Sequence, residues 1–266
     1  MRASGARRRK HNDGCVNHDL QALIFDFDGT IADTERDGHR VAYNAAFREL
    51  GLPWQWDVDT YGRLLAIAGG KERLTAYIEQ MWPAYADGEL PTLVRSVHAT
   101  KARAFRTFAA NLPLRPGIAR LAGEARAQGV RLAIATTAML DGVQAVVLAH
   151  GELTGVFQEI GAGDVVAHKK PAPDIYRYVL ERLGIPAANA VAVEDSATGL
   201  RAALAAGLTT LVTPSDFTAD EDFSGAVAVV SDLGEPGRPA RTLAGSEPPT
   251  GVIDLTFIRS LLPSTS

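Results

Sequence analysis

The amino-acid sequence predicts an α/β fold in which a doubly wound parallel sheet carries an inserted, all-helical domain. Residues 22–25 form an unbroken apolar run without helical spacing, as expected of a strand that is buried on both faces. After residue 113, short apolar runs alternate with segments of helical periodicity, which is typical of parallel strands joined by helices. Between these parts, residues 34–113 show helical periodicity. We therefore expect a helical insertion after the first strand.

The first predicted strand ends in two carboxylates. Asp26 and Asp28 flank Phe27, so their side chains point to the same side of an extended chain. Two acids on one side repel each other unless a cation lies between them, and Mg²⁺ prefers carboxylate, carbonyl and water oxygens. A Ca²⁺-binding loop would need further oxygen ligands at regular spacing, whereas Ile31 and Ala32 follow here. The stretch therefore predicts a Mg²⁺ site.

The helical insertion is divided by residues with special backbone preferences. Asp57 is suited to cap the start of a helix, and Thr92 is suited to cap a longer one. Gly69 and Gly70 break the helical pattern directly before Lys71, and backbone without side chains can approach a ligand closely.

The part of the chain after residue 113 contains the other strands of the predicted sheet. The expected strands span residues 130–135, 156–160, 190–193 and 208–212, with 226–230 as a further candidate. The expected helices run from Pro116 to Gln128, around residues 143–147, over 174–183 and over 197–206.

Reactive side chains stand where these apolar strands end. Asp26 and Asp28 end the first strand, Thr136 ends the second, and Glu194 and Asp195 end the fourth. In an open parallel sheet the carboxyl ends of the strands lie along one edge, and ligands bind there. The sequence therefore predicts a functional site at this edge.

The composition indicates an ordinary globular protein. The 266 residues carry a net charge of -4 and one cysteine, Cys15, which argues against a disulfide framework and a cysteine-rich zinc site. No apolar stretch approaches the ~20 residues of a membrane span, and no secretory signal is present, so we expect a cytoplasmic protein without a membrane partner. Residues 1–19 form a basic tail that we expect to be disordered, while the acidic remainder argues against nucleic-acid binding. We also expect a monomer.

Four segments resemble the motifs of the haloacid dehalogenase-like (HAD) hydrolases. They are residues 25–30, 134–136, 169–174 and 193–196. Their order and spacing match the family over residues 20–232. The resemblance implies a Rossmann-like core, a helical cap domain, and a Pro/Gly-rich linker with a C-terminal segment. The implied ranges are 20–33 and 114–233 for the core, 34–113 for the cap, and 234–266 for the linker and C-terminal segment.

The resemblance also implies a phosphatase and roles for its residues. Asp26 would be the nucleophile that forms an aspartyl-phosphate, and Asp28 the general acid and base. Thr136 and Lys170 would hold the transferring phosphoryl group, and Thr137 would bind substrate. The residues implied to hold the Mg²⁺ cofactor are Asp26, Asp28, Glu194 and Asp195.

Three further stretches resemble the CbbY subgroup of these phosphatases, which are often encoded with Calvin-cycle enzymes. They are residues 33–40, 69–73 and 163–166. This resemblance implies a small phosphorylated sugar as substrate, xylulose 1,5-bisphosphate, bound by Gly70, Lys71 and Arg73. Two alternatives are a sugar-phosphate mutase of the β-phosphoglucomutase type and a phosphosugar-binding regulator without turnover. The intact pair Asp26 and Asp28 disfavours the regulator.

Other tempting side chains receive no role at this point. His39, His98, His150 and His168 share no metal-ligand spacing, and we expect them on the surface or in the cap. We expect Lys169 to be solvated.

Overall fold

The computed structural model describes residues 19–67, 69–85 and 89–263. Within these residues the strands form one seven-stranded sheet in the order β3-β2-β1-β4-β5-β6-β7. The strands are β1 (Ala22–Phe25), β2 (Arg131–Ala135), β3 (Phe157–Gly161), β4 (Ala190–Glu194), β5 (Thr209–Val212), β6 (Ala228–Val230) and β7 (Thr242–Gly245). All neighbours pair in parallel except β7, which is antiparallel to β6. The predicted α/β fold class is confirmed. Apart from Asp19, the predicted basic tail lies outside the described residues.

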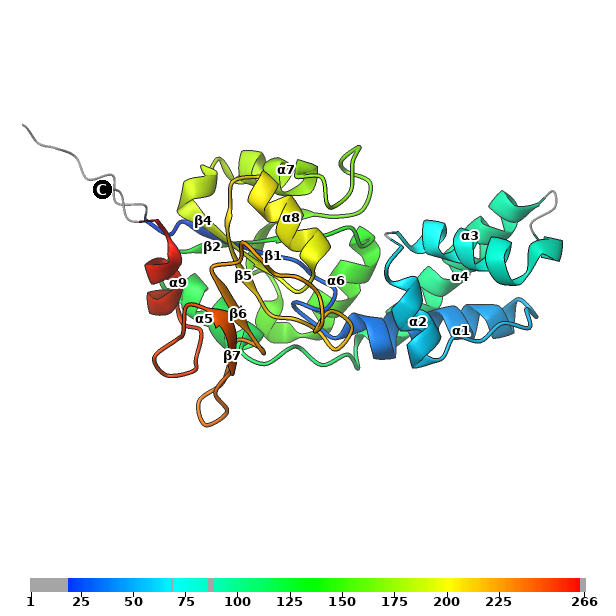
Figure 1. The fold of residues 1–266 in the computed structure, drawn as a ribbon, viewed down its shortest axis with the longest axis horizontal. Helices are drawn as coiled ribbons and strands as arrows, with labels where there is room; N and C mark the ends of the chain where they lie inside the picture. The colour runs from blue at the N-terminus through cyan, green and yellow to red at the C-terminus, as the bar shows by residue number, and fades with distance from the viewer. Residues whose placement is uncertain (1–18, 68, 86–88, 264–266) are drawn as a thin grey trace, which may run out of the picture.

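Helices cover both faces of the sheet (Figure 1). They are α5 (Ile118–Ala127), α6 (Leu140–Ala149), α7 (Asp174–Leu183), α8 (Ala197–Ala205) and α9 (Leu255–Leu261). Alternate residues of β1 point to opposite faces, so Leu23 and Phe25 share one apolar core with α5, α6 and α9. Ala22 and Ile24 share the other core with α7 and α8. Of the helices in the described ranges, none is long and apolar enough to cross a membrane.

The segment between β1 and α5 is helical and lies beyond the carboxyl end of β1 (Figure 1). It contains a π-helical turn (Glu35–His39), α1 (Arg40–Glu49), α2 (Val58–Leu64), α3 (Gly70–Met81) and α4 (Leu90–Ala109). Aromatic side chains, among them Tyr43, Phe47, Trp56 and Tyr61, give these helices an apolar core of their own. The predicted cap at Asp57 is confirmed, because its Oδ1 accepts a hydrogen bond of 2.7 Å from the amide of Thr60.

Two predicted helix starts are wrong. The helix that Thr92 was expected to cap begins at Leu90, because Pro91 fits the first turn, where an N–H would have no partner inside the helix. The helix expected to open with Pro116 begins at Ile118. The glycine between those two residues has a φ of 86°, which interrupts the helical conformation.

The chain after residue 233 is more regular than the linker that the sequence predicts for 234–266. It contains the edge strand β7, and α9 packs on the core through Leu255, Ile258 and Leu261. The sequence pattern did not predict β7. The strand is four residues long and mostly exposed, so it carries no apolar alternation.

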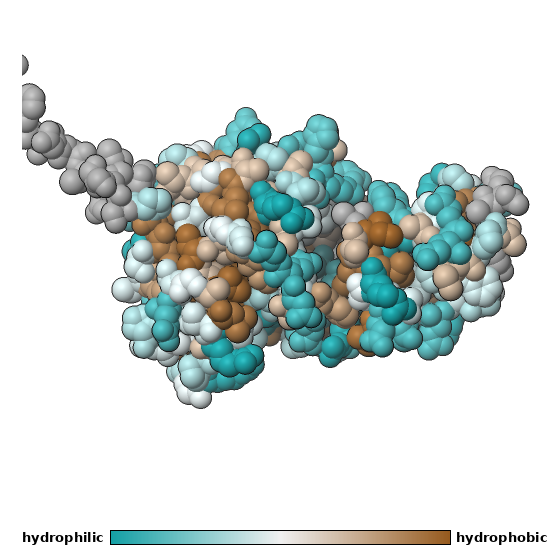
Figure 2. Space-filling model, in the orientation of Figure 1, coloured by the Kyte–Doolittle hydropathy of each residue, from teal (hydrophilic) through white to brown (hydrophobic). Residues whose placement is uncertain are grey.

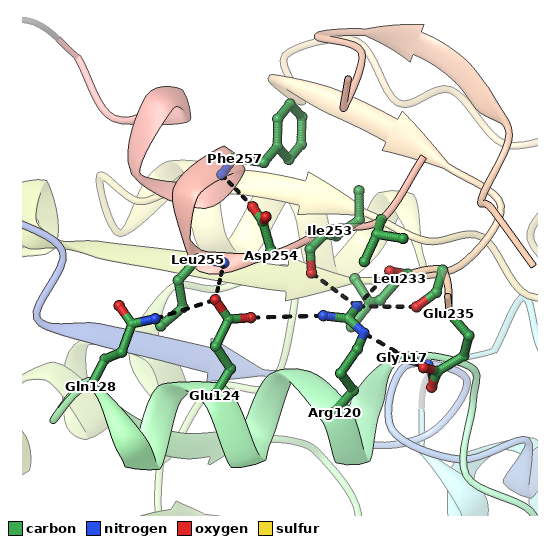
Figure 3. A network of polar contacts seen from close by, with 12 residues as sticks. Gly117, Arg120, Glu124, Gln128, Leu233, Glu235, Ile253, Asp254, Leu255 and Phe257 are labelled. Carbon is green, nitrogen blue, oxygen red and sulfur yellow. Dashed lines mark hydrogen bonds and ion pairs between the residues drawn. The ribbon is translucent and has the colours of Figure 1, made fainter. Parts of the chain in front are cut away.

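Arg120 of α5 fixes this C-terminal segment to the core (Figure 3). Its Nη2 donates hydrogen bonds to the carbonyl oxygens of Leu233 and Ile253 at 2.9 and 3.1 Å. Its guanidinium also lies 3.5 Å from the Glu235 carboxylate and 3.7 Å from that of Glu124. One side chain therefore joins α5 to two separate parts of the segment.

We expect Arg120→Met to lower the free energy of unfolding by about 1–3 kcal/mol, because it removes the donor that the carbonyl groups of Gly234 and Ile253 share. Urea unfolding measures this change. Arg126→Met, on the exposed side of the same helix, is the control and should change stability by less than ~0.5 kcal/mol. Equal effects of the two substitutions would contradict this interpretation of the Arg120 contacts.

Candidate active site

Asp26 directly follows β1, and its carboxylate is buried beside the ammonium group of Lys170. Lys170 lies in the loop before α7, and its Nζ donates hydrogen bonds of 2.6 Å to Asp26 Oδ1 and to Glu194 Oε1. Glu194 ends β4, the strand next to β1. All three side chains belong to residues that are less than a tenth exposed. The fold therefore brings three distant parts of the chain into one buried ionic cluster.

The surroundings of Glu194 fix its carboxylate in place. The hydroxyl of Tyr176, on α7, donates a hydrogen bond to Oε1. The other oxygen lies against the first turn of α8, where a Cβ on Gly199 would come within 2.0 Å of Oε2. Only glycine, which has no Cβ, therefore lets the Glu194 carboxylate come this close to the helix.

Asp195 completes an acidic centre with Asp26 and Glu194, whose carboxylate oxygens lie within 4.8 Å of one another. Burial raises the pKa of Asp26 to about 8, with Lys170 opposing the shift and Glu194 adding to it. Burial also raises the pKa of Asp195 well above its usual value, and the neighbouring carboxylates add to it. For Lys170, burial acts to lower the pKa, but Asp26 and Glu194 outweigh it and raise the pKa above its ordinary value. The ammonium group of Lys170 alone therefore does not balance the negative charge of the Asp26, Glu194 and Asp195 carboxylates.

The donors of this centre fit a hard divalent cation. They are carboxylate oxygens, which suit Mg²⁺ better than metals that prefer sulfur or nitrogen ligands. A second group with suitable geometry in the described part of the chain is Asp28, Glu35 and His39. There, Lys101 Nζ lies 2.9 Å from His39 Nδ1 and disfavours a further cation. The acidic centre is therefore the candidate metal site.

The carboxylate of Asp28 contacts residues of the helical insertion. Its Oδ1 accepts a hydrogen bond from Thr34 Oγ1 and lies 3.0 Å from His39 Nε2. Burial acts to raise the pKa of Asp28, but His39 and Thr34 outweigh it and hold the pKa below its usual value. His39 stacks on Phe105 with ring centroids 4.3 Å apart and continues the contact to Lys101. Asp28 is therefore held by residues of the insertion.

A cavity of about 280 Å³ lies between the core and the helical insertion. Asp28, His39 and Lys101 line one part of it, and residues of the α3 start and of the turn after β2 line others. The molecular outline narrows where the two parts of the chain join (Figures 1 and 2). Because Asp28 follows β1 and Thr137 follows β2, and both line the cavity, the cavity lies at the predicted edge of the sheet.

The structure places the predicted site residues in two groups. Asp26, Lys170, Glu194 and Asp195 form the acidic centre, whereas Asp28, Gly70, Lys71, Arg73 and Thr137 line the cavity. Thr136 follows β2 and is buried, and its Oγ1 accepts a hydrogen bond of 3.0 Å from the amide of Ala138.

Arg73 is engaged within the insertion as well as bordering the cavity. Its Nε donates to the carbonyl of Leu64 at 3.0 Å, and its Nη1 to the hydroxyl of Tyr61 at 3.3 Å. Lys169 was expected to be solvated, but it lies 3.3 Å from the Asp164 carboxylate and also borders the cavity.

The residues that hold the predicted acids have no assigned role in the sequence patterns. His39 and Lys101 beside Asp28, and Tyr176 beside Glu194, are the clearest cases. Two features of the sequence could have pointed to these residues. His39 lies within the CbbY-like stretch 33–40, and Tyr176 follows shortly after Lys170.

Comparison with known proteins places this site in a family. A family model of the haloacid dehalogenase-like hydrolases matches residues 20–207. The chain belongs to the haloacid dehalogenase-like hydrolases. The plasmid-encoded protein CbbY of Cupriavidus necator is 50% identical over 225 residues, which are 83% of this chain and 88% of that protein.

Solved structures of a HAD-like hydrolase agree with this assignment. CbbY from Rhodobacter sphaeroides in complex with phosphate has a TM-score of 0.72 and 41% identity, covering 80% of this chain and 94% of that one. A variant of the same protein in complex with xylulose-(1,5)bisphosphate has a TM-score of 0.71 with the same identity and coverage. The chain is therefore a CbbY-like phosphatase of the HAD family, which argues against the alternative of a regulator without turnover.

We expect the metal-free phosphatase to lose stability as the pH rises. The pKa of Asp26 is about 8 in the folded state against an ordinary value of 3.8. Between these values the folded state holds a proton that the unfolded chain has released, so the free energy of unfolding falls with increasing pH. Asp26→Asn should flatten this dependence by about one proton, as measured by urea unfolding in EDTA between about pH 5 and pH 8.

A residual slope is expected in the variant, because Asp195 retains its own raised pKa. Parallel pH dependences for the wild type and Asp26→Asn would contradict the shift assigned to Asp26.

Proposed function

We propose that this phosphatase hydrolyses xylulose 1,5-bisphosphate with Mg²⁺ as cofactor and Asp26 as the nucleophile. The observation that carries the proposal is the juxtaposition of Asp26 and Lys170, 2.6 Å apart and buried, with a cavity bordered by cationic side chains. The structural relative crystallised with xylulose-(1,5)bisphosphate supports the choice of substrate.

Asp26 and Lys170 account for the first half of the proposed reaction. A carboxylate oxygen of Asp26 forms a bond to phosphorus while the bond from phosphorus to the sugar oxygen breaks, which gives an aspartyl-phosphate. Lys170 and the Thr136 hydroxyl hold the phosphoryl oxygens as their charge develops. Mg²⁺, held by Asp26, Glu194, Asp195 and the backbone carbonyl of Asp28, would supply positive charge that keeps Asp26 ionised beside an anionic substrate.

Asp28 accounts for the proton transfers. Its carboxyl group gives a proton to the departing sugar oxygen, and its carboxylate then takes a proton from the water that attacks the aspartyl-phosphate. That attack releases inorganic phosphate and restores Asp26. Asp28 borders the cavity and follows Asp26 by two residues in the chain, which supports this role.

The start of α3 is proposed to bind the second phosphate of the substrate. Gly69 has a φ of 91°, which favours glycine, and α3 begins with Gly70 and Lys71 at the cavity. A helix N-terminus and an ammonium group both favour an anion. Since Lys170 holds the transferring phosphoryl group beside Asp26 in this mechanism, Lys71 is left for the phosphate at the far end of the sugar.

Asp26→Asn should lower kcat at least ~10³-fold, because the substitution removes the attacking carboxylate. Phosphate release from xylulose 1,5-bisphosphate measures this loss, and circular dichroism verifies that the fold is retained. Wild-type activity should also disappear in excess EDTA. Unchanged turnover in the variant or in EDTA would refute the mechanism.

The same assay separates a phosphatase from a mutase. With β-glucose 1-phosphate and a trace of bisphosphate, we expect phosphate release or no reaction. Efficient formation of glucose 6-phosphate would instead support the β-phosphoglucomutase alternative.

Lys71→Ala should lower kcat/KM for the bisphosphate by ~10- to 100-fold, the usual contribution of a charge-assisted contact. It should leave hydrolysis of p-nitrophenyl phosphate nearly unchanged, because that ester has no second phosphate. Arg63→Ala is the matched control, since Arg63 is an exposed cation of the insertion. Equal losses on both substrates would show that Lys71 supports the cap or the chemistry instead.

A further inference from the structure

Arg115 is a buried cation close to the acidic centre, at the point where the chain returns from the helical insertion to the core. Its residue is 9% exposed, which is unusual for a charged side chain. Among the described residues, no carboxylate lies within 4.0 Å of its guanidinium. The preceding residue, Leu114, forms a bridge with Ala32, so both connections to the insertion meet here. The interactions that compensate the buried charge must therefore come from other groups.

Backbone carbonyl oxygens from separate loops supply this compensation. Nη1 donates to the carbonyl of Gly29, and also to that of Thr213 at 2.8 Å. Nη2 donates to the carbonyls of Pro214 and Ser231, both at 2.9 Å. The planar guanidinium thus holds the turn after β1, the loop after β5 and the residue after β6 in one arrangement.

Two of these loops form the walls around Asp195. A Cβ on Gly29 would come 2.2 Å from Asp195 Oδ2, so the Gly29 turn lies directly against the carboxylate. In the loop after β5, the amide of Thr213 donates to the carbonyl of Glu194 at 2.7 Å. Thr218 Oγ1 donates to the carbonyl of Asp195 at 2.7 Å. Arg115 therefore contacts the backbone that surrounds Asp195, without contacting the space for a ligand.

We propose that Arg115 is a positioning residue that fixes Gly29 and the Thr213–Pro214 backbone against Asp195 and thereby sets the affinity of the acidic centre for Mg²⁺. The inference rests on the Mg²⁺-dependent function proposed above. Groups that orient metal ligands typically contribute ~10- to 100-fold to metal affinity. The fork of the guanidinium is suited to this, because its two terminal nitrogens reach the carbonyls of Gly29, Thr213, Pro214 and Ser231 together, which the compact ammonium group of lysine does not reproduce.

The test is the binding of Mg²⁺ alone to the full-length protein, followed by isothermal titration calorimetry. We expect Arg115→Met to raise the dissociation constant by ~10- to 100-fold, and Arg115→Lys to raise it by a smaller factor. Saturating Mg²⁺ should restore most of kcat in both variants, because Arg115 does not touch the substrate. The matched control is Arg120→Met, which also removes a guanidinium bound to backbone carbonyls but leaves the walls of the acidic centre intact.

The outcomes separate this inference from the proposed function. If the wild type fails to bind Mg²⁺, the proposed function itself is wrong. If the wild type binds and the Arg115 variants bind equally well, or if Arg120→Met weakens binding as much as Arg115→Met, the inference is overturned. Should Arg115→Met not fold, the comparison uses Arg115→Lys. Failure of both to fold would assign Arg115 a purely structural role and overturn the inference.

Discussion

The burial of the Asp26, Glu194 and Asp195 carboxylates around the ammonium group of Lys170 is the constraint on which the site depends. Removing charges from water costs on the order of several kcal/mol per ion, and Lys170 offsets part of that cost. Tyr176 offsets a further part by its hydrogen bond to Glu194. The remaining negative charge explains why this centre suits a divalent cation and an anionic substrate together. Without a cation or an anionic substrate to bind, burying this many carboxylates would only lower the stability of the fold.

The order of strands explains why these groups meet at β1. From β1 the sheet continues to β2 and β3 on one side and to β4 and β5 on the other. At such a switch point the connections leave in opposite directions and open a crevice at the carboxyl ends of the strands. Asp26 stands at this point, with Thr136 after one neighbouring strand and Glu194 at the end of the other. Because the helical insertion leaves the sheet directly after β1, it lies at the same crevice (Figure 1).

The sequence predicted the strands near the site because they are continuous apolar runs that end in polar residues. It missed β7, whose four residues are mostly exposed and therefore lack an apolar pattern. His39 received no role because histidines were compared with metal-ligand spacing, whereas its contact with Asp28 depends on the π-helical turn that precedes α1. Arg115 carries no sequence signal either, because its partners are backbone carbonyls, which every residue has. The role of a side chain that binds other residues of the site can be recognised only once the fold is known.

The contacts of Asp28 connect the helical insertion to the proposed chemistry. A group that first gives and then takes a proton depends on surroundings that allow both forms, and the residues around Asp28 favour its carboxylate form. Here the surroundings come from the insertion, since His39 lies between Asp28 and Lys101 of α4. Burial lowers the pKa of Lys101 to about 8, so the ammonium group beside His39 loses its proton more readily than an exposed lysine does. In the proposed mechanism Asp28 must carry a proton before it can act as an acid, and His39 and Thr34 of the insertion hold its pKa low, so the insertion would influence proton transfer as well as enclose the sugar.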